Sequence, residues 1–228
     1  MKILTTSNYK TLKGEGIGIM TGILHLAPSY LSGYQVCPCS STGCETACLN
    51  TAGRGAFSNV QQARIRRTEM FFQNREKFMQ LLRKDIESLR RKATRIGMQC
   101  AVRLNGTSDI DWRRFGIFEA YPDVQFYDYT KVYRRMVEAR PSNYHLTFSR
   151  SEVNDDEAIK VLSQNGNVAV VFDHLPTDWN GYKVIAGDDN DVRFSGEQGV
   201  VIGLLAKGKA RKDKTGFVVS PMTHFNNN

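Results

Sequence analysis

The strongest constraint on the fold is an alternation of short apolar runs with turns and amphipathic stretches, which begins after residue 97. Short apolar runs bounded by turn residues are typical of buried strands. Strands that alternate with helices imply a parallel sheet with right-handed crossovers. About seven strands are predicted, at Ile17–Leu26, Gln99–Leu104, Val124–Tyr129, Tyr144–Phe148, Val168–Phe172, Tyr182–Ile185 and Val200–Leu205.

Three other stretches carry apolar residues at helical spacing. The first is long enough for one helix or two, with Ser58 as a candidate N-cap and an end near Gly97. Asn154 is the candidate N-cap of the last. The predicted helices lie at Val60–Ile96, Lys131–Ala139 and Asp155–Gln164.

This pattern predicts an α/β fold, in the form of a partial or closed β/α barrel of the TIM type with about seven mostly parallel strands. A doubly wound sheet is the alternative. The 228 residues can bury one sizeable core, so we treat residues 1–228 as a single domain. In both architectures ligands gather at the C-terminal ends of the strands.

Four of the five cysteines lie within a segment rich in glycine and serine that follows the first predicted strand. They are Cys37, Cys39, Cys44 and Cys48. Thiols stay reduced inside cells, so such a group indicates a metal or redox site before it indicates disulfides. Zinc sites usually consist of two separated C-x2-C pairs, whereas one compact group suits an iron–sulfur cluster.

We therefore predict a [4Fe–4S] cluster on Cys37, Cys44 and Cys48, with one iron left open or held by another group. Candidates for the fourth ligand are Cys39, His25 and an exogenous molecule. Structural zinc, or cysteines without a metal, are the alternatives. Cys100 lies within an apolar run and is predicted to be a small core residue.

Polar residues follow nearly every predicted strand. Each one alone can be explained as a turn former or a helix cap. As a series at strand ends they predict a site for a polar small molecule beside the cysteines. The candidate ligand-binding residues are Asn105, Ser108, Asp109, Asp128, Lys131, Ser149, Glu152 and Asp188.

The formal net charge of +8 permits an acidic partner such as nucleic acid but does not require one. The basic segment Lys207–Lys214 contains glycine and could hold phosphates, but we favour a solvent-exposed loop. The apolar runs fall far short of the roughly 20 residues that span a bilayer, and the N-terminus lacks the apolar part of a signal peptide. We expect a cytoplasmic protein with no membrane partner.

The segment from His25 to Gly53, which contains the cysteines, resembles the gene-product-88-like family of bacteriophage proteins. Further similarity lies at Asn105–Asp109, at Tyr127–Lys131, at Leu146–Ser149 with Glu152, at Gly187 and Asp188 with Asp191 and Arg193, and at Gly203–Lys209. Three cysteines of the family pattern match Cys37, Cys44 and Cys48. The resemblance implies a phage origin, hence a location in the host cytoplasm, and a cluster on these three cysteines, but it implies no particular reaction.

The layout is also similar to a reduced radical S-adenosylmethionine enzyme, in which a cluster loop follows the first strand of a partial barrel. This similarity implies S-adenosylmethionine as a candidate second cofactor. The spacing here is C-x6-C-x3-C, whereas that class has C-x3-C-x2-C. Two functions of other classes stay open: a basic nucleic-acid-binding protein with a structural metal, and an electron carrier or redox sensor.

Overall fold

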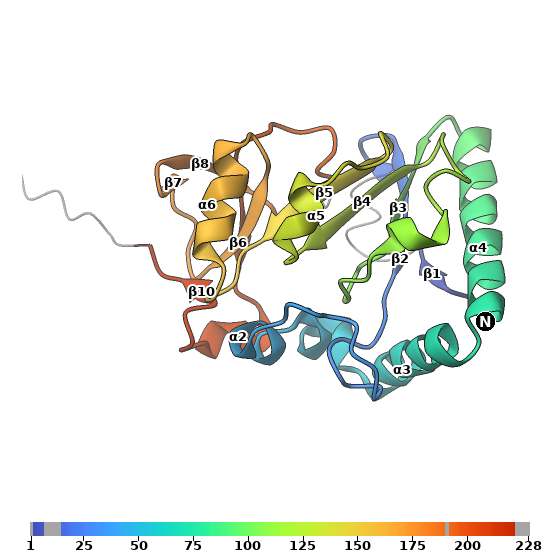
Figure 1. Ribbon diagram of the computed structural model, residues 1–228, viewed down its shortest axis with the longest axis horizontal. Helices are drawn as coiled ribbons and strands as arrows, with labels where there is room; N and C mark the ends of the chain where they lie inside the picture. Colours follow the sequence, from blue (N-terminus) through green and yellow to red (C-terminus); the bar gives the residue numbers. More distant parts are fainter. Residues whose placement is uncertain (1, 7–14, 190–191, 222–228) are drawn as a thin grey trace, which may run out of the picture.

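The computed structural model describes residues 2–6, 15–189 and 192–221 and is shown in Figure 1. The α-helices and strands within these residues are β1 (Leu4–Thr5), β2 (Ile19–Leu24), α2 (Thr42–Thr46), α3 (Ser58–Gln73), α4 (Arg75–Arg95), β3 (Gln99–Arg103), β4 (Gln125–Thr130), α5 (Tyr133–Val137), β5 (Tyr144–Ser149), α6 (Asp155–Ser163), β6 (Val168–Phe172), β7 (Asp178–Trp179), β8 (Tyr182–Ala186), β9 (Val201–Leu205) and β10 (Val218–Val219). Short 3-10 helices are η1 (Leu49–Thr51), η2 (Gly53–Ala56), η3 (Trp112–Phe115) and η4 (Gly208–Lys212).

In this part of the chain ten strands form one sheet, in the order β1-β2-β3-β4-β5-β6-β9-β8-β7, with β10 paired to β6. All pairings are parallel except β1 with β2 and β7 with β8. The order rises steadily from β2 to β6, so the crossovers advance in one direction and do not reverse as in a doubly wound sheet. The α/β class and the mostly parallel sheet are confirmed.

The sheet is open, so the closed form of the predicted barrel is wrong. Strands β1 and β7 stand at opposite ends of the strand order, and no pairing between described residues joins them. Closure of a barrel depends on the tilt and stagger of all strands together. The pattern within single strands therefore does not reveal it.

The core lies mainly between the sheet and the helices on one of its faces. Along β3, Cys100 and Val102 enter the large cluster that contains Leu82 and Ile86 of α4. Ala101, between them in sequence, packs on the opposite face with Ile19. Helix α6 buries its apolar side against β5 and β6 in a second cluster. Cys100 is thus a core residue, as predicted.

All seven predicted strands are present as β2, β3, β4, β5, β6, β8 and β9. The short strands β1, β7 and β10 were not predicted, because two residues are too few to show a period. The long helical stretch is two helices, separated at Asn74 and ending before Gly97, which has a φ of 69°. Asn154 is the N-cap of α6, but Ser58 begins α3 and Phe57 is its N-cap.

The segment with the cysteines lies across the ends of the strands. In Figure 1, α2 and α3 run along the lower side of the molecule, below the sheet, while α5 and α6 lie over the strands. The cysteine segment therefore covers the sheet edge at which the strands β3, β4 and β5 end.

No helix of the described residues is both long and apolar enough to cross a membrane.

Candidate functional site

A cavity of about 300 Å³ lies between the cysteine segment and the carboxyl ends of the parallel strands. All four clustered cysteines line it. So do six of the eight polar residues predicted to bind a ligand, namely Asn105, Ser108, Asp109, Lys131, Ser149 and Asp188. Counted with the cysteines, which follow β2, they lie at the ends of five strands (β2, β3, β4, β5 and β8), and the common edge of a parallel sheet brings them together.

Hydrogen bonds hold the cysteine segment to the end of β3. The Asp109 amide donates to the Val36 carbonyl at 2.7 Å, and the Thr107 hydroxyl donates to the Leu26 carbonyl at 2.6 Å. A Cβ on Gly106 would lie 2.6 Å from the Leu24 carbonyl oxygen, so a larger residue would push these backbones apart. Close approach of two backbones therefore requires glycine at this position.

Glu152 secures the other side of the segment from behind the cavity wall. Its carboxylate accepts hydrogen bonds from the Ser41 hydroxyl and the Gly43 amide, both at 2.7 Å. Ser41 is the N-cap of α2 and accepts from the Cys44 amide at 3.2 Å. Glu152 is not part of the cavity lining, and its contacts hold α2 in place.

The cysteines are free thiols with different exposure. Cys37, Cys44 and Cys48 are half-buried, whereas Cys39 is exposed. Burial raises the pKa of Cys37 to about 12 and also raises the pKa of Cys48. At neutral pH both groups keep their protons unless a cation displaces them, as a soft metal does when it binds thiolate.

A buried guanidinium lies beside Cys48. Arg64 of α3 donates to the Asn50 side chain, and among the described residues no carboxylate forms an ion pair with it. Burial lowers the pKa of Arg64, and the neighbouring Cys48 raises it in part. A buried charge is costly without a partner. The Arg64 charge therefore offsets part of the effect of burial, which on balance raises the pKa of Cys48.

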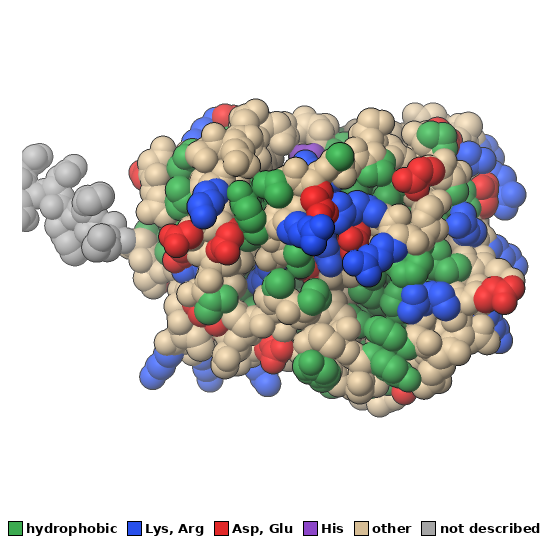
Figure 2. Space-filling view, viewed as in Figure 1, with side chains coloured by type: hydrophobic (Ala, Val, Ile, Leu, Met, Phe, Trp, Pro, Cys, Tyr) green, Lys and Arg blue, Asp and Glu red, His purple; other side chains and the backbone are tan. Residues whose placement is uncertain are grey.

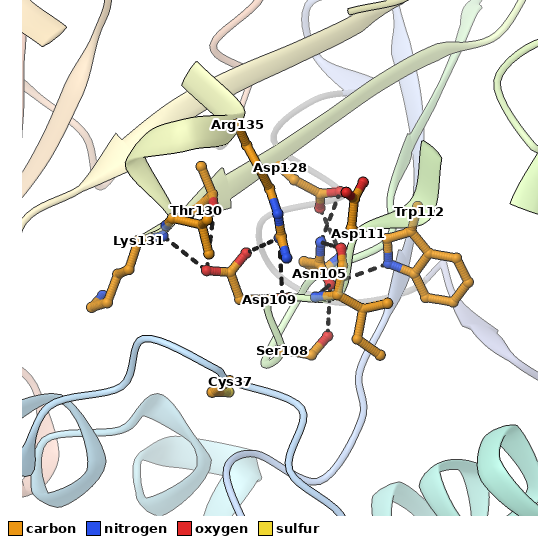
Figure 3. A network of polar contacts seen from close by, with 12 residues as sticks. Cys37, Asn105, Ser108, Asp109, Asp111, Trp112, Asp128, Thr130, Lys131 and Arg135 are labelled. Atoms are coloured by element: carbon orange, nitrogen blue, oxygen red, sulfur yellow. Dashed lines mark hydrogen bonds and ion pairs between the residues drawn. The ribbon is translucent and has the colours of Figure 1, made fainter. Parts of the chain in front are cut away.

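Asn105 and Asp128 form a buried network at the end of β3 (Figure 3). The Asn105 amide donates to Asp128 Oδ1 at 2.6 Å. Asn105 Oδ1 accepts from Ser108, Ile110 and Trp112 at 2.9, 2.9 and 3.1 Å. Asp128 lies outside the cavity lining and contacts the start of the loop after β3 through its hydrogen bonds from Asn105.

Asp109 and Lys131 stand on the cavity wall. Asp109 accepts from the Lys131 amide at 2.8 Å and pairs with Arg135 at 2.6 Å. Burial raises the Asp109 pKa, while Arg135 opposes this shift. Lys131 Nζ donates to the Ser149 hydroxyl at 2.8 Å, close to the ring of Phe217. Figure 3 shows Cys37 beneath this group of charged and polar side chains.

The remaining predicted residues differ in whether they line the cavity. Asp188 lines the cavity, accepts from the Leu205 amide at 3.0 Å and pairs with Lys207. His25 is half-buried and packs against Gly106, but it is not among the lining residues. The basic residues beyond Lys207 form η4, where Lys209 and Lys212 are exposed, so most of that segment lies at the surface as expected.

Sequence reasoning missed two lining residues on strands. The Arg103 guanidinium lies 4.5 Å from the ring centre of Tyr129, and both residues line the cavity. The alternation of strand side chains could have identified them, because Ala101 and Arg103 face away from the core that holds Val102. Phe217 also lines the cavity, brought there by β10, which the sequence pattern did not reveal.

No three His, Cys, Asp or Glu side chains of the described residues are grouped so that they could hold one metal ion. The predicted iron–sulfur cluster does not need three side chains around one metal ion, because each thiolate would bind a different iron atom of the cluster. The three predicted ligands share one cavity and are donors of the right chemistry, but their role as ligands stays a prediction.

The fold and this site define an α/β protein with a cysteine-lined cavity at the carboxyl edge of an open, mostly parallel sheet. The family model described as gene product 88 matches residues 2–221. The chain therefore belongs to the gene product 88 family, which confirms the resemblance inferred from its motifs. No curated protein and no solved structure matches the chain.

Proposed function

We propose that this protein is a phage iron–sulfur protein of the host cytoplasm that holds a [4Fe–4S] cluster on Cys37, Cys44 and Cys48. A polar small molecule would bind in the same cavity. The observation that carries the proposal is the shared lining: the clustered cysteines and polar residues from five strand ends surround one space. Such convergence is the usual form of a ligand site in parallel α/β folds.

The donor set suits this group. Thiolates are preferred by iron–sulfur clusters, and the half-buried cysteines would exchange their protons for iron. When bound, the cluster would supply a redox-active iron with an open coordination position. Arg64 beside Cys48 would balance part of the negative charge that thiolates and sulfides bring. Cys39, which also lines the cavity but is exposed, is the candidate fourth ligand.

The polar wall would orient the small molecule. Lys131 and Lys207 can bind a carboxylate, and Asp188 can accept from an ammonium group. Tyr129 and Phe217 offer apolar surface to a ring. An amino acid derivative such as S-adenosylmethionine combines these groups, so we propose it as the first ligand to test. Because the cysteine spacing differs from that of radical enzymes, turnover of this ligand needs a separate assay.

The first experiment is anaerobic purification and reconstitution, followed by measurement of iron, acid-labile sulfide and zinc together with the visible spectrum. About four irons and four sulfides per chain are expected. Replacement of Cys37, Cys44 or Cys48 by serine should remove most of the iron and sulfide. Cys100→Ala, in the core, is the matched control and should retain both.

Zinc without sulfide would refute the cluster and make the cysteine segment a structural metal site, so that nucleic-acid binding would become the leading function. Equal iron loss in the three ligand variants and in Cys100→Ala would refute the ligand assignment. If the cluster forms, binding of S-adenosylmethionine is tested by equilibrium dialysis. A reduced, cluster-loaded protein that neither binds nor consumes it would exclude that ligand.

A further inference from the structure

A second cavity lies on the other side of the cysteine segment. It has a volume of about 610 Å³ and is formed by the α3–α4 junction, η3, α5 and residues 35–38. We call it the arginine groove, after the five arginines in its lining: Arg75, Arg113, Arg114, Arg134 and Arg135. Figure 2 shows Lys and Arg side chains gathered in the middle of this face, with acidic side chains between them and hydrophobic ones below.

The groove contains more cations than anions. Its three carboxylates, Asp109, Asp111 and Glu138, are already paired. Arg135 binds Asp109 at 2.6 Å, and Arg113 binds both Asp111 and Glu138 at 2.8 Å. Arg134 also reaches Glu138. Five arginines against three carboxylates leave two excess positive charges. One resides on Arg75, and the other is shared by Arg113, Arg114 and Arg134, which together contact Asp111 and Glu138.

Arg75 is held in position by aromatic rings in place of an acid. Its guanidinium lies 3.7 Å from the ring centre of Phe71 and 5.1 Å from that of Phe115, and it donates to the Phe71 carbonyl. No described carboxylate forms an ion pair with it, and burial lowers its pKa. A planar cation fixed by stacking can bind an anion with little further loss of freedom.

Arg114, which lies on η3, is a further arginine of the groove. Its side chain is 81% exposed, and its ion pair with Asp111 is long, at 4.0 Å. Guanidinium groups that approach from separate elements suit a group with several oxygens, and phosphate presents more oxygens in more directions than a carboxylate does. Phe72, stacked on Tyr34 at 4.4 Å, adds an aromatic wall to the groove.

We propose that the arginine groove binds the phosphate of a nucleotide or of a single nucleic-acid strand. The site is separate from the cysteine cavity but shares a wall with it. Val36 and Pro38 line the groove, whereas Cys37 and Cys39 line the cavity, and Asp109 lines both. A ligand in the groove would therefore lie one residue layer from the cysteines. The proposal holds whether or not a cluster binds.

Binding is measured on the full chain without iron, by calorimetry with pyrophosphate and ADP and by fluorescence anisotropy with a short labelled oligo-dT. Arg75→Gln and Arg114→Gln should each weaken binding about tenfold, the loss expected for a charged hydrogen bond. Arg91→Gln, at an exposed position of α4 outside the groove, removes the same charge and should change binding much less. Arg114 is so exposed that its replacement will not disturb folding.

Binding of ADP together with weak binding of oligo-dT would identify a free nucleotide as the ligand, and the reverse would identify a strand. Absence of binding by all three probes would overturn the proposal. An equal loss in the Arg91→Gln protein would also overturn it, because the effect would then come from overall charge. Citrate that competes as well as pyrophosphate would refute the preference for phosphate.

Discussion

Asp128 is a buried carboxyl group whose pKa lies far from its ordinary value. It is completely buried, and burial raises its pKa to about 7 even though Asn105 donates to it. In the unfolded chain the same group titrates near 3.8. Between these two pH values the folded protein binds the proton and the unfolded chain does not. The stabilising effect is therefore complete at low pH and is lost as the pH rises through about 7.

We predict that wild-type stability falls, through this group, by as much as about 4 kcal/mol between pH 4 and pH 8. Asp128→Asn, which resembles the protonated acid, should lose this part of the pH dependence. Urea denaturation of both proteins across that range checks it. His145, whose pKa burial lowers to about 4, contributes with the opposite sign below pH 6.5 but cancels in the comparison. Parallel stability curves for the two proteins would contradict the prediction.

Glu152 was predicted to bind a ligand; in the structure it lies outside the cavity lining and accepts hydrogen bonds from Ser41 and Gly43 at the start of α2. We expect Glu152→Gln to loosen the cysteine segment, because the charge that accepts from Ser41 and Gly43 is lost. Amide hydrogen exchange at residues 41–48 should become roughly tenfold faster, equivalent to about 1.4 kcal/mol. Glu45→Gln is the control, since the Glu45 carboxylate accepts from the Ser29 and Ser40 hydroxyls and not from Ser41 or Gly43. Unchanged exchange in the Glu152 variant would exclude the positioning role.

At the scale of elements, the break between α3 and α4 depends on Asn74. Its Oδ1 accepts from the Lys77 amide at 3.1 Å, so it satisfies one of the free amides at the start of α4. Asn74→Ala should lower the free energy of unfolding by about 1 kcal/mol. Urea denaturation measures the loss, and Gln62→Ala at an exposed position of α3 is the comparison. A loss of equal size at Gln62 would show that the cap has no special effect.

The junction of α3 and α4 also lines the arginine groove. Phe71 and Arg75 stand on either side of Asn74, and their stacked contact forms at the junction of the two helices. Residues four apart lie on the same side of a helix, so the Arg75 guanidinium reaches the Phe71 ring and also lies near Phe115 of η3, where all three residues line the groove.

At the scale of the whole molecule, Arg150 ties the C-terminal segment to the sheet. Its guanidinium binds Asp155 at 2.6 Å and donates to the carbonyls of Gly216 and Phe217. Phe217 lines the cysteine cavity, and the following Val218 pairs with Val171 of β6. Arg150 thus holds Phe217 in the cavity wall, although the two residues lie far apart in sequence.

We predict that Arg150→Gln destabilises the protein by about 2 kcal/mol, because buried carbonyls lose a charged donor. Cleavage by trypsin in the exposed basic residues 209–214 should become faster, which limited proteolysis followed by mass spectrometry can detect. Arg134→Gln, at an exposed position of α5, should leave the cleavage rate unchanged. Equal cleavage of both variants would show that Arg150 does not hold the segment.

Local patterns determined much of the architecture. The run Val168–Phe172 was predicted with the bounds of β6, because a strand with apolar residues on both sides stands out from its polar turns. The placement of polar residues at strand ends followed in the same way, since all parallel strands end at one edge. The cysteine spacing pointed to that edge as well, because the segment directly follows β2.

The sequence by itself thus determined the fold class, the family, the order of the main elements and the residues around the cavity. Only the tertiary structure decided that the sheet stays open, that Asp128 and Glu152 stand behind the cavity wall, and that arginines from three elements meet in one groove. The physical reason is distance along the chain. Period and spacing report each residue's immediate neighbours, whereas these features arise from contacts between segments that fold together only in the assembled core.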